Sequence, residues 1–418
     1  MANPPTVNGP TGASVAPGAT ETTGAAAREC LVTLNAGSSS IKFALFAIAD
    51  GTLDLLARGQ VEGFGAHPRF EVKPADGPEI SRDLAEDEDA HDHKAALETI
   101  LGWLGENHPN ACVVAVGHRI VHGGLKYAEP AIVDDALMAE VEALSPLAPL
   151  HQPHNIAGIE AARAAFPGVP QVACFDTAFH RAHPFVNDVY ALPRRFYDEG
   201  IRRYGFHGLS YEYLARRLAE IAPEVAQKRV VAAHLGNGAS MCALRNGRSI
   251  ASTMGFSALD GLAMGTRCGQ LDPGILLYLM TERGMDAAAL TELLYKESGL
   301  KGLSELSHDM RVLEASETEA ARDAIDYYVF RIHREVGAMA AVLNGLDAVV
   351  FAGGIGENAW RVRARALERM HWLGIELDPA ANAANAERVT TRASRIPVFV
   401  IRTDEEAMIA EHTLRLVG

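Results

Sequence analysis

The stretch LVTLNAGSSSIKFALF, residues 31–46, predicts two short strands joined by a turn of small residues. A second stretch of the same kind, VVAAHLGNGASMCALR, occupies residues 230–245, which is 199 positions later along the chain. Four of the sixteen aligned positions are identical, namely Val32 with Val231, Gly37 with Gly236, Ala44 with Ala243 and Leu45 with Leu244. The repeated order of strand, small turn and strand predicts a duplicated domain with two facing hairpins.

Glycine-rich turns occur at three places and are candidate phosphate-binding loops. The two hairpin turns offer backbone N–H groups and hydroxyls without a bulky side chain, although ordinary β-turns have the same composition. The third turn, AGGIGEN (352–358), follows the apolar strand DAVVF (347–351) and precedes a helical pattern at 360–373. This order favours an anion or nucleotide site, with a purely structural turn as the alternative. It is neither a complete G-x-G-x-x-G nor a Walker A motif, so a Rossmann fold is disfavoured.

Composition limits the class of protein. The 418 residues predict about two domains, and the net charge of −15 disfavours nucleic acids and anionic membranes as partners. Five dispersed cysteines without a C-x-x-C pair favour a reducing cytoplasm. The longest apolar stretches, such as 111–117, are shorter than the roughly 18 residues of a membrane span. Residues 1–27 lack the marks of a signal or transit peptide and are expected to form a disordered tail.

Several cationic and imidazole groups lie beside predicted strand ends and glycines. Arg119 in GHRIVHGG (117–124) follows a strand, and Arg267 stands next to glycines in MGTRCGQLDPG (264–274). Glycines allow a ligand to approach closely, whereas an arginine in an ordinary surface loop is usually only solvated. His151 and His154 in LHQPHN (150–155) could suggest a zinc pair, but the intervening proline and the lack of a third ligand disfavour it.

Carboxylates follow two other predicted strands. Asp176 comes at the end of the strand in ACFDTAFH (173–180), and Asp404, Glu405 and Glu406 follow VFVI (398–401). Carboxylates at strand ends beside phosphate loops are typical partners of Mg²⁺. The alternative for Glu405 and Glu406 is the acidic bias of a helix N-terminus.

Eight motifs, in this order, resemble the acetate kinase family from about residue 29 to the C-terminus: LNAGSSSIKFALF, GHRIVHGG, CFDTAFH, RRYGFHGLS, HLGNGAS, MGFSALDGLAMGTRCGQLDPG, FAGGIGEN and TDEEAMIA. The resemblance implies a duplicated ribonuclease-H-like α/β fold, shared with sugar kinases, Hsp70 and actin, with ATP bound between two domains. We expect one domain at 28–178 plus 404–418 and the other at 179–403.

The resemblance implies reversible, direct in-line transfer of a phosphoryl group from ATP to acetate, giving acetyl phosphate and ADP. Mg²⁺ is the expected metal, with Mn²⁺ as a substitute, and a homodimer is the expected assembly. A carboxylate acceptor is already ionised at neutral pH, so the reaction needs no strong general base. Repulsion between the two anionic reactants remains, and arginines, an imidazole, Mg²⁺ and backbone N–H groups would offset it.

The residues that the resemblance implies fall into four groups. The catalytic group is Arg119, Asp176, His207 and Arg267. The acetate site comprises Arg119, Val121, Leu150, His151 and Phe206. The metal ligands are Asn35 and Glu405. The nucleotide site comprises Ser38, Ser40, Lys42, His234, Gly236, Asn237, Gly238, Asp309, Met310, Arg311, Gly354, Ile355, Gly356, Glu357 and Asn358. Asp176 could act as a base, but metal or water positioning is the favoured role.

Two departures from the family pattern are Ala258, where proline is expected, and Gln152, where asparagine is expected. Because Ala258 lies near the expected methyl pocket, acetate or propionate remains open as the preferred acid. Two alternatives come from other classes. An Hsp70-like ATPase would require an appended partner-binding domain, whereas only about 13 residues follow Glu405. An actin-like filament protein would leave Arg119, His207 and Arg267 without a role.

Overall fold

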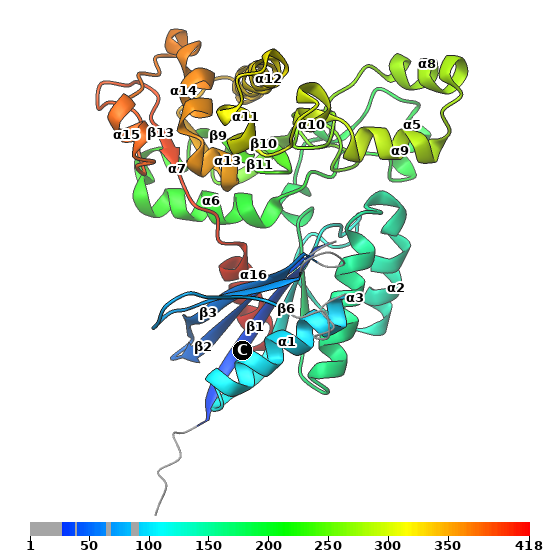
Figure 1. The fold of residues 1–418 in the computed structure, drawn as a ribbon, viewed down its shortest axis with the longest axis vertical. Helices are drawn as coiled ribbons and strands as arrows, with labels where there is room; N and C mark the ends of the chain where they lie inside the picture. The colour runs from blue at the N-terminus through cyan, green and yellow to red at the C-terminus, as the bar shows by residue number, and fades with distance from the viewer. Residues whose placement is uncertain (1–26, 38–39, 64–67, 85–91) are drawn as a thin grey trace, which may run out of the picture.

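The computed structural model describes residues 27–37, 40–63, 68–84 and 92–418. The predicted tail, apart from residue 27, and Ser38 of the first hairpin turn therefore lie outside the described residues. The chain forms two sheets with helices around each, one above the other in Figure 1.

The first sheet contains the first predicted hairpin. Its strands are β1 (Arg28–Ala36), β2 (Ser40–Ala49), β3 (Thr52–Glu62), β4 (Arg69–Pro74), β5 (Ile80–Asp83), β6 (Ala111–Ile120), β7 (Ala131–Ile132) and β8 (Gln171–Phe175). They lie in the order β5-β4-β3-β2-β1-β6-β8-β7. Strand β1 pairs antiparallel with β2 and parallel with β6, which in turn pairs parallel with β8.

The second sheet repeats the centre of the first. Its strands are β9 (Arg229–Leu235), β10 (Ala239–Arg245), β11 (Arg248–Ser252), β12 (Ala348–Ala352) and β13 (Val398–Val400), in the order β11-β10-β9-β12-β13. This order and its strand directions match β3-β2-β1-β6-β8, because β9 pairs antiparallel with β10 and parallel with β12. The duplication predicted from the two hairpins is thus present in the topology.

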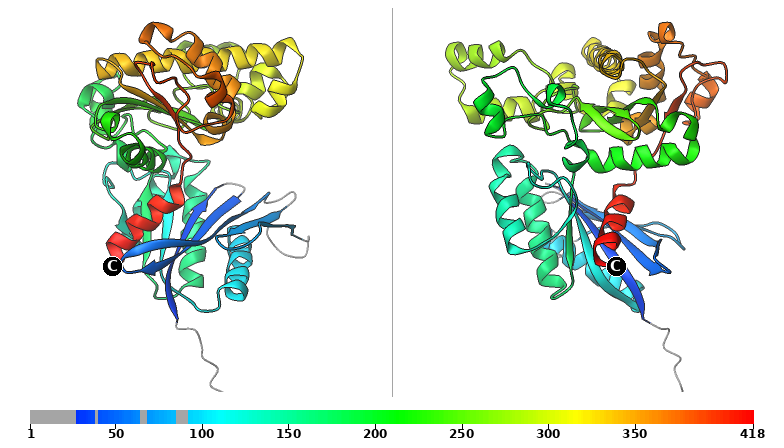
Figure 2. Two further views of the ribbon diagram at one scale, coloured as in Figure 1. Left: turned by 90° about the vertical axis from the view of Figure 1, so that its left-hand side faces the viewer. Right: turned by 180° about the vertical axis from the view of Figure 1, so that it is seen from behind.

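Sixteen α-helices surround the sheets in the described residues. They are α1 (His93–Asn107), α2 (Asp135–Ala143), α3 (Gln152–Ala165), α4 (Phe185–Asp188), α5 (Arg194–Asp198), α6 (Gly208–Ile221), α7 (Pro223–Ala226), α8 (Pro273–Arg283), α9 (Ala287–Lys296), α10 (Gly299–Ser304), α11 (Met310–Ala315), α12 (Glu319–Leu343), α13 (Gly353–Asn358), α14 (Trp360–Glu368), α15 (Pro379–Ala383) and α16 (Glu405–Val417). Helices α1 and α3 cover one face of the first sheet, and the C-terminal α16 covers the other (Figure 2).

The glycine-rich segment 352–358 differs from the expected turn. Strand β12 ends at Ala352 and helix α13 begins at the next residue, Gly353. Gly353 has a φ of +74°, and a Cβ there would lie 2.8 Å from the carbonyl oxygen of Leu235 on β9. A glycine at this position therefore lets the chain pass from strand to helix without a connecting loop. The following helix, α14, ends at Glu368, before the predicted end at residue 373.

Within the described residues, no helix is both long enough and apolar enough to cross a bilayer.

Candidate functional site

Arg119 stands near the end of β6 and gathers polar groups from three other segments. Its Nε donates to Asp176 Oδ1 at 3.1 Å, and its Nη2 donates to Asp176 Oδ2 at 2.5 Å. Its Nη1 donates to Asn35 Oδ1 on β1 at 3.3 Å, and its Nε lies 3.5 Å from Glu405 Oε2. Because β1 and β6 are parallel neighbours and β8 lies beside β6, their C-terminal ends bring these side chains together.

Asn35 and Glu405, the predicted metal ligands, contact each other. Asn35 Nδ2 donates to Glu405 Oε2 at 3.3 Å, and Ser210 of α6 donates to Glu405 Oε1. Burial raises the pKa of the Glu405 carboxyl, but Arg119 and its other polar neighbours outweigh burial and hold the pKa below its usual value. A carboxylate and an amide oxygen are the hard donors that Mg²⁺ prefers, so these residues fit a magnesium ion.

Asp176 is buried behind this cluster. Burial raises the pKa of its carboxyl to about 6, although Arg119 acts in the opposite direction. Burial alone would lower the pKa of Arg119, but Asp176 and Glu405 raise it above its ordinary value. The backbone N–H of His207 lowers the pKa of Asp176 by a smaller amount. The bidentate contact fixes the plane of the guanidinium, as expected for a residue that positions Arg119.

Two imidazoles, His207 and His234, stack beside the cluster with ring centroids 4.3 Å apart. His207 is the N-cap of α6 and adopts the left-handed conformation with φ +59°. Burial lowers the pKa of both rings, and the second ring and Arg119 lower that of His207 further. The structure therefore brings together His207, His234 and Arg119, which are 27 to 115 residues apart in the sequence.

Arg267 enters the same region from the second half of the chain. Its Nη1 donates to the carbonyl of Ala258 at 3.0 Å, and its Nη2 lies 3.5 Å from His151 Nε2. Among the described residues, no carboxylate forms an ion pair with Arg267, and burial lowers the pKa of its guanidinium. Arg267 is half-buried, and a partly desolvated cation without a protein anion is costly, so this arrangement suits an anionic ligand.

The turn between β9 and β10 lies directly against these groups. A Cβ at Gly238 would lie 3.4 Å from His207 Nε2 and 3.8 Å from Arg267 Nη1. A Cβ at Gly236 would lie 3.9 Å from His234 Nε2 and 4.0 Å from the backbone nitrogen of Gly354. Glycines thus keep open the space between the two histidines, Arg267 and the start of α13.

The first hairpin supplies Ser40 and Lys42 at the start of β2. Lys42 is the register partner of Asn35 on β1, and Ser40 accepts the backbone N–H of Gly37 through its carbonyl at 2.8 Å. The positive charge of Lys42 lowers the pKa of Glu405, after larger contributions from Arg119, His234 and Ser210.

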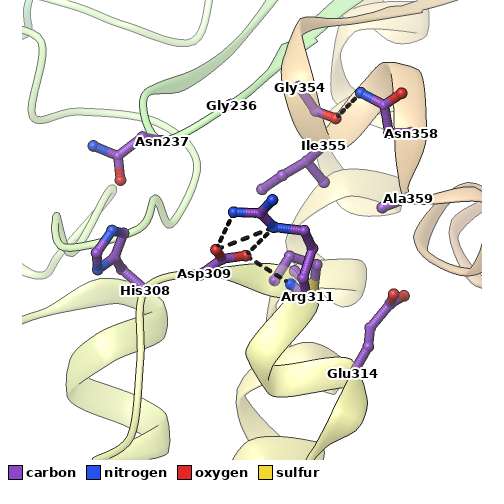
Figure 3. Close-up of a pocket in the computed structure, with 11 residues that line it drawn as sticks. Gly236, Asn237, His308, Asp309, Arg311, Glu314, Gly354, Ile355, Asn358 and Ala359 are labelled. Atoms are coloured by element: carbon purple, nitrogen blue, oxygen red, sulfur yellow. Dashed lines mark hydrogen bonds and ion pairs between the residues drawn. The ribbon is translucent and has the colours of Figure 1, made fainter. Parts of the chain in front are cut away.

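A cavity of about 590 Å³ adjoins the second glycine turn. Eight predicted nucleotide residues line it: Gly236, Asn237, Asp309, Met310, Arg311, Gly354, Ile355 and Asn358. Figure 3 shows the Arg311 guanidinium and the Ile355 side chain facing each other across it, with Arg311 bonded to Asp309. The other predicted members that the structure describes lie outside the lining. Gly356 accepts a hydrogen bond from Arg363, and Glu357 accepts the backbone N–H groups of Gly353 and Thr403.

The predicted acetate residues divide between an apolar cluster and its margin. Val121 and Phe206 belong to one buried cluster, against which Ala258 packs. Leu150 is half-buried and lies outside that cluster. His151 reaches Arg267, whereas His154 stacks on His93 with ring centroids 5.2 Å apart, so the two histidines face different partners.

Sequence reasoning did not assign roles to several residues at the site. Ser210 contacts Glu405, Ser240 contacts His207, and His308, Glu314 and Ala359 line the cavity. Ser210 and Ser240 lie inside the motifs YGFHGLS and HLGNGAS, and the adjacency of those motifs to His207 and Gly238 was the available signal. His308 and Ala359 directly adjoin the predicted residues Asp309 and Asn358, whereas no pattern marks Glu314.

Comparisons with known proteins agree with the geometry. A profile of the acetokinase family matches residues 30–411. The chain is 62% identical to an acetate kinase of Methylocella silvestris (93% of this chain, 98% of the relative). It is 53% identical to an acetate kinase of Nitrobacter hamburgensis (93% of this chain, 96% of the relative). A crystal structure of Porphyromonas gingivalis acetate kinase superposes with a TM-score of 0.82 at 37% identity, covering 93% of this chain and 100% of that one. A crystal structure of a propionate kinase from Francisella tularensis superposes with a TM-score of 0.85 at 36% identity, covering 93% of this chain and 99% of that one. The predicted duplicated ribonuclease-H-like, actin-like ATPase fold is confirmed, and the chain belongs to the acetokinase family.

Proposed function

We propose that this protein catalyses reversible, Mg²⁺-dependent transfer of the γ-phosphoryl group of ATP to acetate, giving acetyl phosphate and ADP. The observation that carries the proposal is the half-buried Arg267, which lacks a carboxylate partner in the described residues and adjoins His207 and the glycine turn. A dianionic phosphoryl group in transit would supply the missing negative charge. The names of the relatives support acetate as the acceptor.

In this proposal the cavity beside α13 holds the nucleoside of ATP. Arg311 and Ile355 would contact the base from opposite sides, and the glycine turn 236–238 would receive the phosphates. Ser38, Ser40, Lys42, His234 and Gly354 to Asn358 would complete the nucleotide site. The N–H groups of the turn meet phosphate oxygens without obstruction, because a Cβ at Gly238 would occupy space beside His207 and Arg267.

Acetate would lie between the two arginines, with its methyl group against Val121 and Phe206. Leu150 and His151 would form the margin of this pocket. A carboxylate oxygen would then attack phosphorus in line with the departing ADP, without a base. Asp176 would hold Arg119 in place through its two hydrogen bonds rather than remove a proton. Asn35 and Glu405 would hold Mg²⁺, or Mn²⁺ in its place, which neutralises phosphate charge when bound.

The test measures acetyl phosphate as its hydroxamate after incubation with ATP, Mg²⁺ and acetate. We expect acyl phosphate to form. We also expect Arg119→Ala and Arg267→Ala each to lower kcat by about 10³-fold, which is the lower end of the effect of an arginine that stabilises the transition state of phosphoryl transfer. Arg217→Ala, at an exposed arginine of α6, is the matched control and keeps full activity. Absence of acyl phosphate from every short carboxylate would overturn the proposal and favour an ATPase of another class.

We further propose the division into 28–178 plus 404–418 and 179–403. In the sequence, β8 is the last strand of the first sheet. Helix α16 follows the second sheet in the sequence but packs on β1, β6 and β8 of the first. The chain would therefore cross twice between the halves, at about 178 and about 404. This arrangement allows the halves to move as bodies around the reactants.

The homodimer remains a proposal, and helix α8 supports it. Its sequence PGILLYLMTER has no buried residue, and Ile275, Leu277, Tyr278 and Met280 are 44 to 65% exposed. An apolar helix of this kind favours burial against a second copy of the chain. In light scattering coupled to gel filtration we expect a dimer for the unmodified chain and a monomer for Leu277→Glu. Leu416→Glu, on α16 in the other half, is the control and stays dimeric (Figure 1).

A reducing compartment, the cytoplasm, is the proposed location. All five cysteines are free, and Cys30, Cys174 and Cys242 are buried in apolar surroundings. Such thiols persist where disulfides are not formed.

A further inference from the structure

A buried chain of hydrogen bonds runs from Tyr211 through Ser240 to His207. The Tyr211 hydroxyl lies 2.6 Å from Ser240 Oγ, which lies 2.8 Å from His207 Nδ1. Tyr211 comes from α6, one turn after His207, and Ser240 comes from the start of β10. Tyr211 and Ser240 are both completely buried, so neither hydroxyl exchanges its partner with bulk water.

The direction of the protons follows from the number of acceptors. In the described part of the chain, Ser240 Oγ is the one hydrogen-bond partner of the Tyr211 hydroxyl, so it is the one acceptor available for the Tyr211 proton. Tyr211 therefore donates to Ser240, and Ser240 directs its own proton to His207 Nδ1. The opposite direction would leave the Tyr211 proton buried without an acceptor, which costs about 1 to 3 kcal/mol.

This direction determines which ring nitrogen of His207 carries a proton. Because Nδ1 accepts from Ser240, a neutral imidazole must have its proton on Nε2. The Nε2 edge faces the glycine turn, since a Cβ at Gly238 would lie 3.4 Å from it and 3.8 Å from Arg267 Nη1. The Nε2–H is thus a donor beside the arginine that the proposed reaction requires.

The backbone around His207 holds the ring in this orientation. The carbonyl of the preceding Phe206 accepts from His180 Nε2 at 2.9 Å, and the backbone N–H of His207 lowers the pKa of the nearby Asp176 carboxyl. The left-handed conformation at His207 is a sparsely populated one for a residue other than glycine. In this conformation Nδ1 lies 2.8 Å from Ser240 Oγ, so the relay and the backbone together specify one ring position.

We propose that Tyr211 and Ser240 are positioning residues that fix His207 as its Nε2–H tautomer, which donates a hydrogen bond to the phosphoryl group in transit. A neutral donor suits this place because Arg119 and Arg267 already supply positive charge. The hydrogen bond from Ser240 sets the tautomer of His207, as hydrogen bonds to the second ring nitrogen do for histidines that ligate metals. The catalytic role of His207 rests on the proposed function, whereas its tautomer does not.

The tautomer is measured by long-range ¹H–¹⁵N correlation on protein labelled with ¹⁵N-histidine, and the His207 signals are assigned by their loss in His207→Gln. In the unmodified protein we expect a protonated Nε2 and an unprotonated Nδ1 that accepts a hydrogen bond. In Ser240→Ala we expect the Nδ1 signal to move to the position of a nitrogen without a hydrogen bond. A proton on Nδ1 in the unmodified protein would overturn the proposal, whatever reaction the protein catalyses.

Kinetics test the consequence for the phosphoryl group. We expect Ser240→Ala and Tyr211→Phe to lower kcat by about 10- to 100-fold with little change in KM for ATP or acetate. Ser240→Thr, which keeps the hydroxyl, restores most of the kcat. The control is Ser252→Ala on β11, because Ser252 is buried but its hydroxyl has no hydrogen-bond partner in the described residues.

If Ser240→Ala fails to fold, Tyr211→Phe carries both measurements, since it removes only a hydroxyl. Ser240 then no longer receives the Tyr211 proton and can accept from Nδ1, so we expect part of the His207 signal to shift to the Nδ1–H tautomer. An unchanged kcat in a folded variant, or an effect confined to KM, would show that the relay does not act on the transferred group.

Discussion

At the scale of single residues, Arg119 shows how a cation is held in a half-buried position. Three of its nitrogens contact Asp176, Asn35 or Glu405, so its charge is compensated and its direction is fixed. Arg267 differs, because its contacts are a carbonyl oxygen and an imidazole. We infer a division of roles, in which Arg119 is preorganised by the protein and Arg267 gains its counter-charge from the reactants.

Glu405 and Glu406 are neighbours in sequence but differ in their contacts. Glu405 bonds to Asn35 and Ser210, whereas in the described part of the chain the ion pairs of Arg119 go to Asp176 and Glu405 and not to Glu406. We expect Glu405→Ala to raise the Mg²⁺ concentration for half-maximal activity by about tenfold or more. Glu406→Ala, the matched control, leaves it nearly unchanged.

The measurement is a Mg²⁺ titration of protein first treated with EDTA. Equal shifts for the two variants would show that Glu405 is not the metal ligand. Isothermal titration with MgADP gives the same comparison without turnover.

Ala258 connects the methyl pocket to Arg267. It packs on the cluster that contains Val121 and Phe206, and its carbonyl accepts from Arg267. Proline at this position would keep the carbonyl and add bulk to the pocket, where one methylene is worth about 1 to 3 kcal/mol. We expect acetate to be preferred, propionate to be used measurably, and Ala258→Pro to widen the acetate-to-propionate ratio of kcat/KM.

Both acids are assayed on both proteins, and thermal unfolding confirms that the variant folds. An unchanged ratio would remove Ala258 from the choice of acid. A preference of the unmodified protein for propionate would change the proposed acceptor.

Residue contacts were the least predictable level. Arg119, Asp176 and Glu405 were each predicted at a strand end. Asp176 and Glu405 lie 57 and 286 positions after Arg119 in the sequence, so no local pattern sets the distances between the three side chains. Their expected association came from the resemblance to a family. The motifs YGFHGLS and HLGNGAS marked His207 and Ser240, but nothing in the sequence marked the hydrogen bonds of the Tyr211–Ser240–His207 relay, which join α6 to β10.

At the scale of elements, the repeated hairpin was predictable because strand and turn composition is local. Val32 and Val231 mark equivalent strands, and Gly37 and Gly236 mark equivalent turns, within sheets of matching order. Helix α13 was not predictable in the same way, because the three glycines of GGIGEN disfavour a helix by propensity. Packing against β9 and the cap from Glu357 to the Gly353 N–H override that preference.

The start of α13 gives a prediction with a neighbouring control. A Cβ at Gly353 would meet the Leu235 backbone at 2.8 Å with φ +74°, whereas a Cβ at Gly354 meets nothing within 4 Å. Gly353→Ala is therefore expected to lower the free energy of unfolding by about 1 to 3 kcal/mol. Gly354→Ala leaves stability nearly unchanged but raises KM for ATP, because Gly354 lines the cavity.

Urea unfolding and ATP kinetics on the two variants separate these effects. Equal stability of the two variants would contradict the strain at Gly353. An unchanged KM in Gly354→Ala would place the nucleotide elsewhere.

At the scale of the whole molecule, charge is distributed unevenly. The chain carries a net charge of −15, yet Arg119, Arg267 and Lys42 lie near the turns of the two repeated hairpins. The overall field therefore repels anions at a distance, and binding depends on local contacts. This predicts that nucleotide affinity responds more to substitutions at these side chains than to changes of surface charge.

Buried neutral histidines predict how stability depends on pH. His118, His122 and His180 are buried, and burial lowers their pKa values from 6.5 to about 4, about 3 and about 4. Between the folded and unfolded pKa values the unfolded chain binds more protons, so stability is full above about pH 6.5 and is lost as pH falls toward 4. Asp176, with its pKa raised to about 6, works in the opposite direction but is outnumbered.

We therefore expect the free energy of unfolding in urea to fall between pH 7.5 and 5.5, by on the order of 1 kcal/mol for each of these histidines. His118→Asn removes one titrating group and reduces the slope, and His371→Ala, at an exposed position, is the control that leaves it unchanged. Stability that stays constant or rises as the pH is lowered would mean that these histidines bind protons at least as readily in the folded protein as in the unfolded chain. The hydrogen bond from His118 Nε2–H to Gln171 Oε1 would persist in that case, because the amide oxygen accepts from the neutral and from the protonated ring.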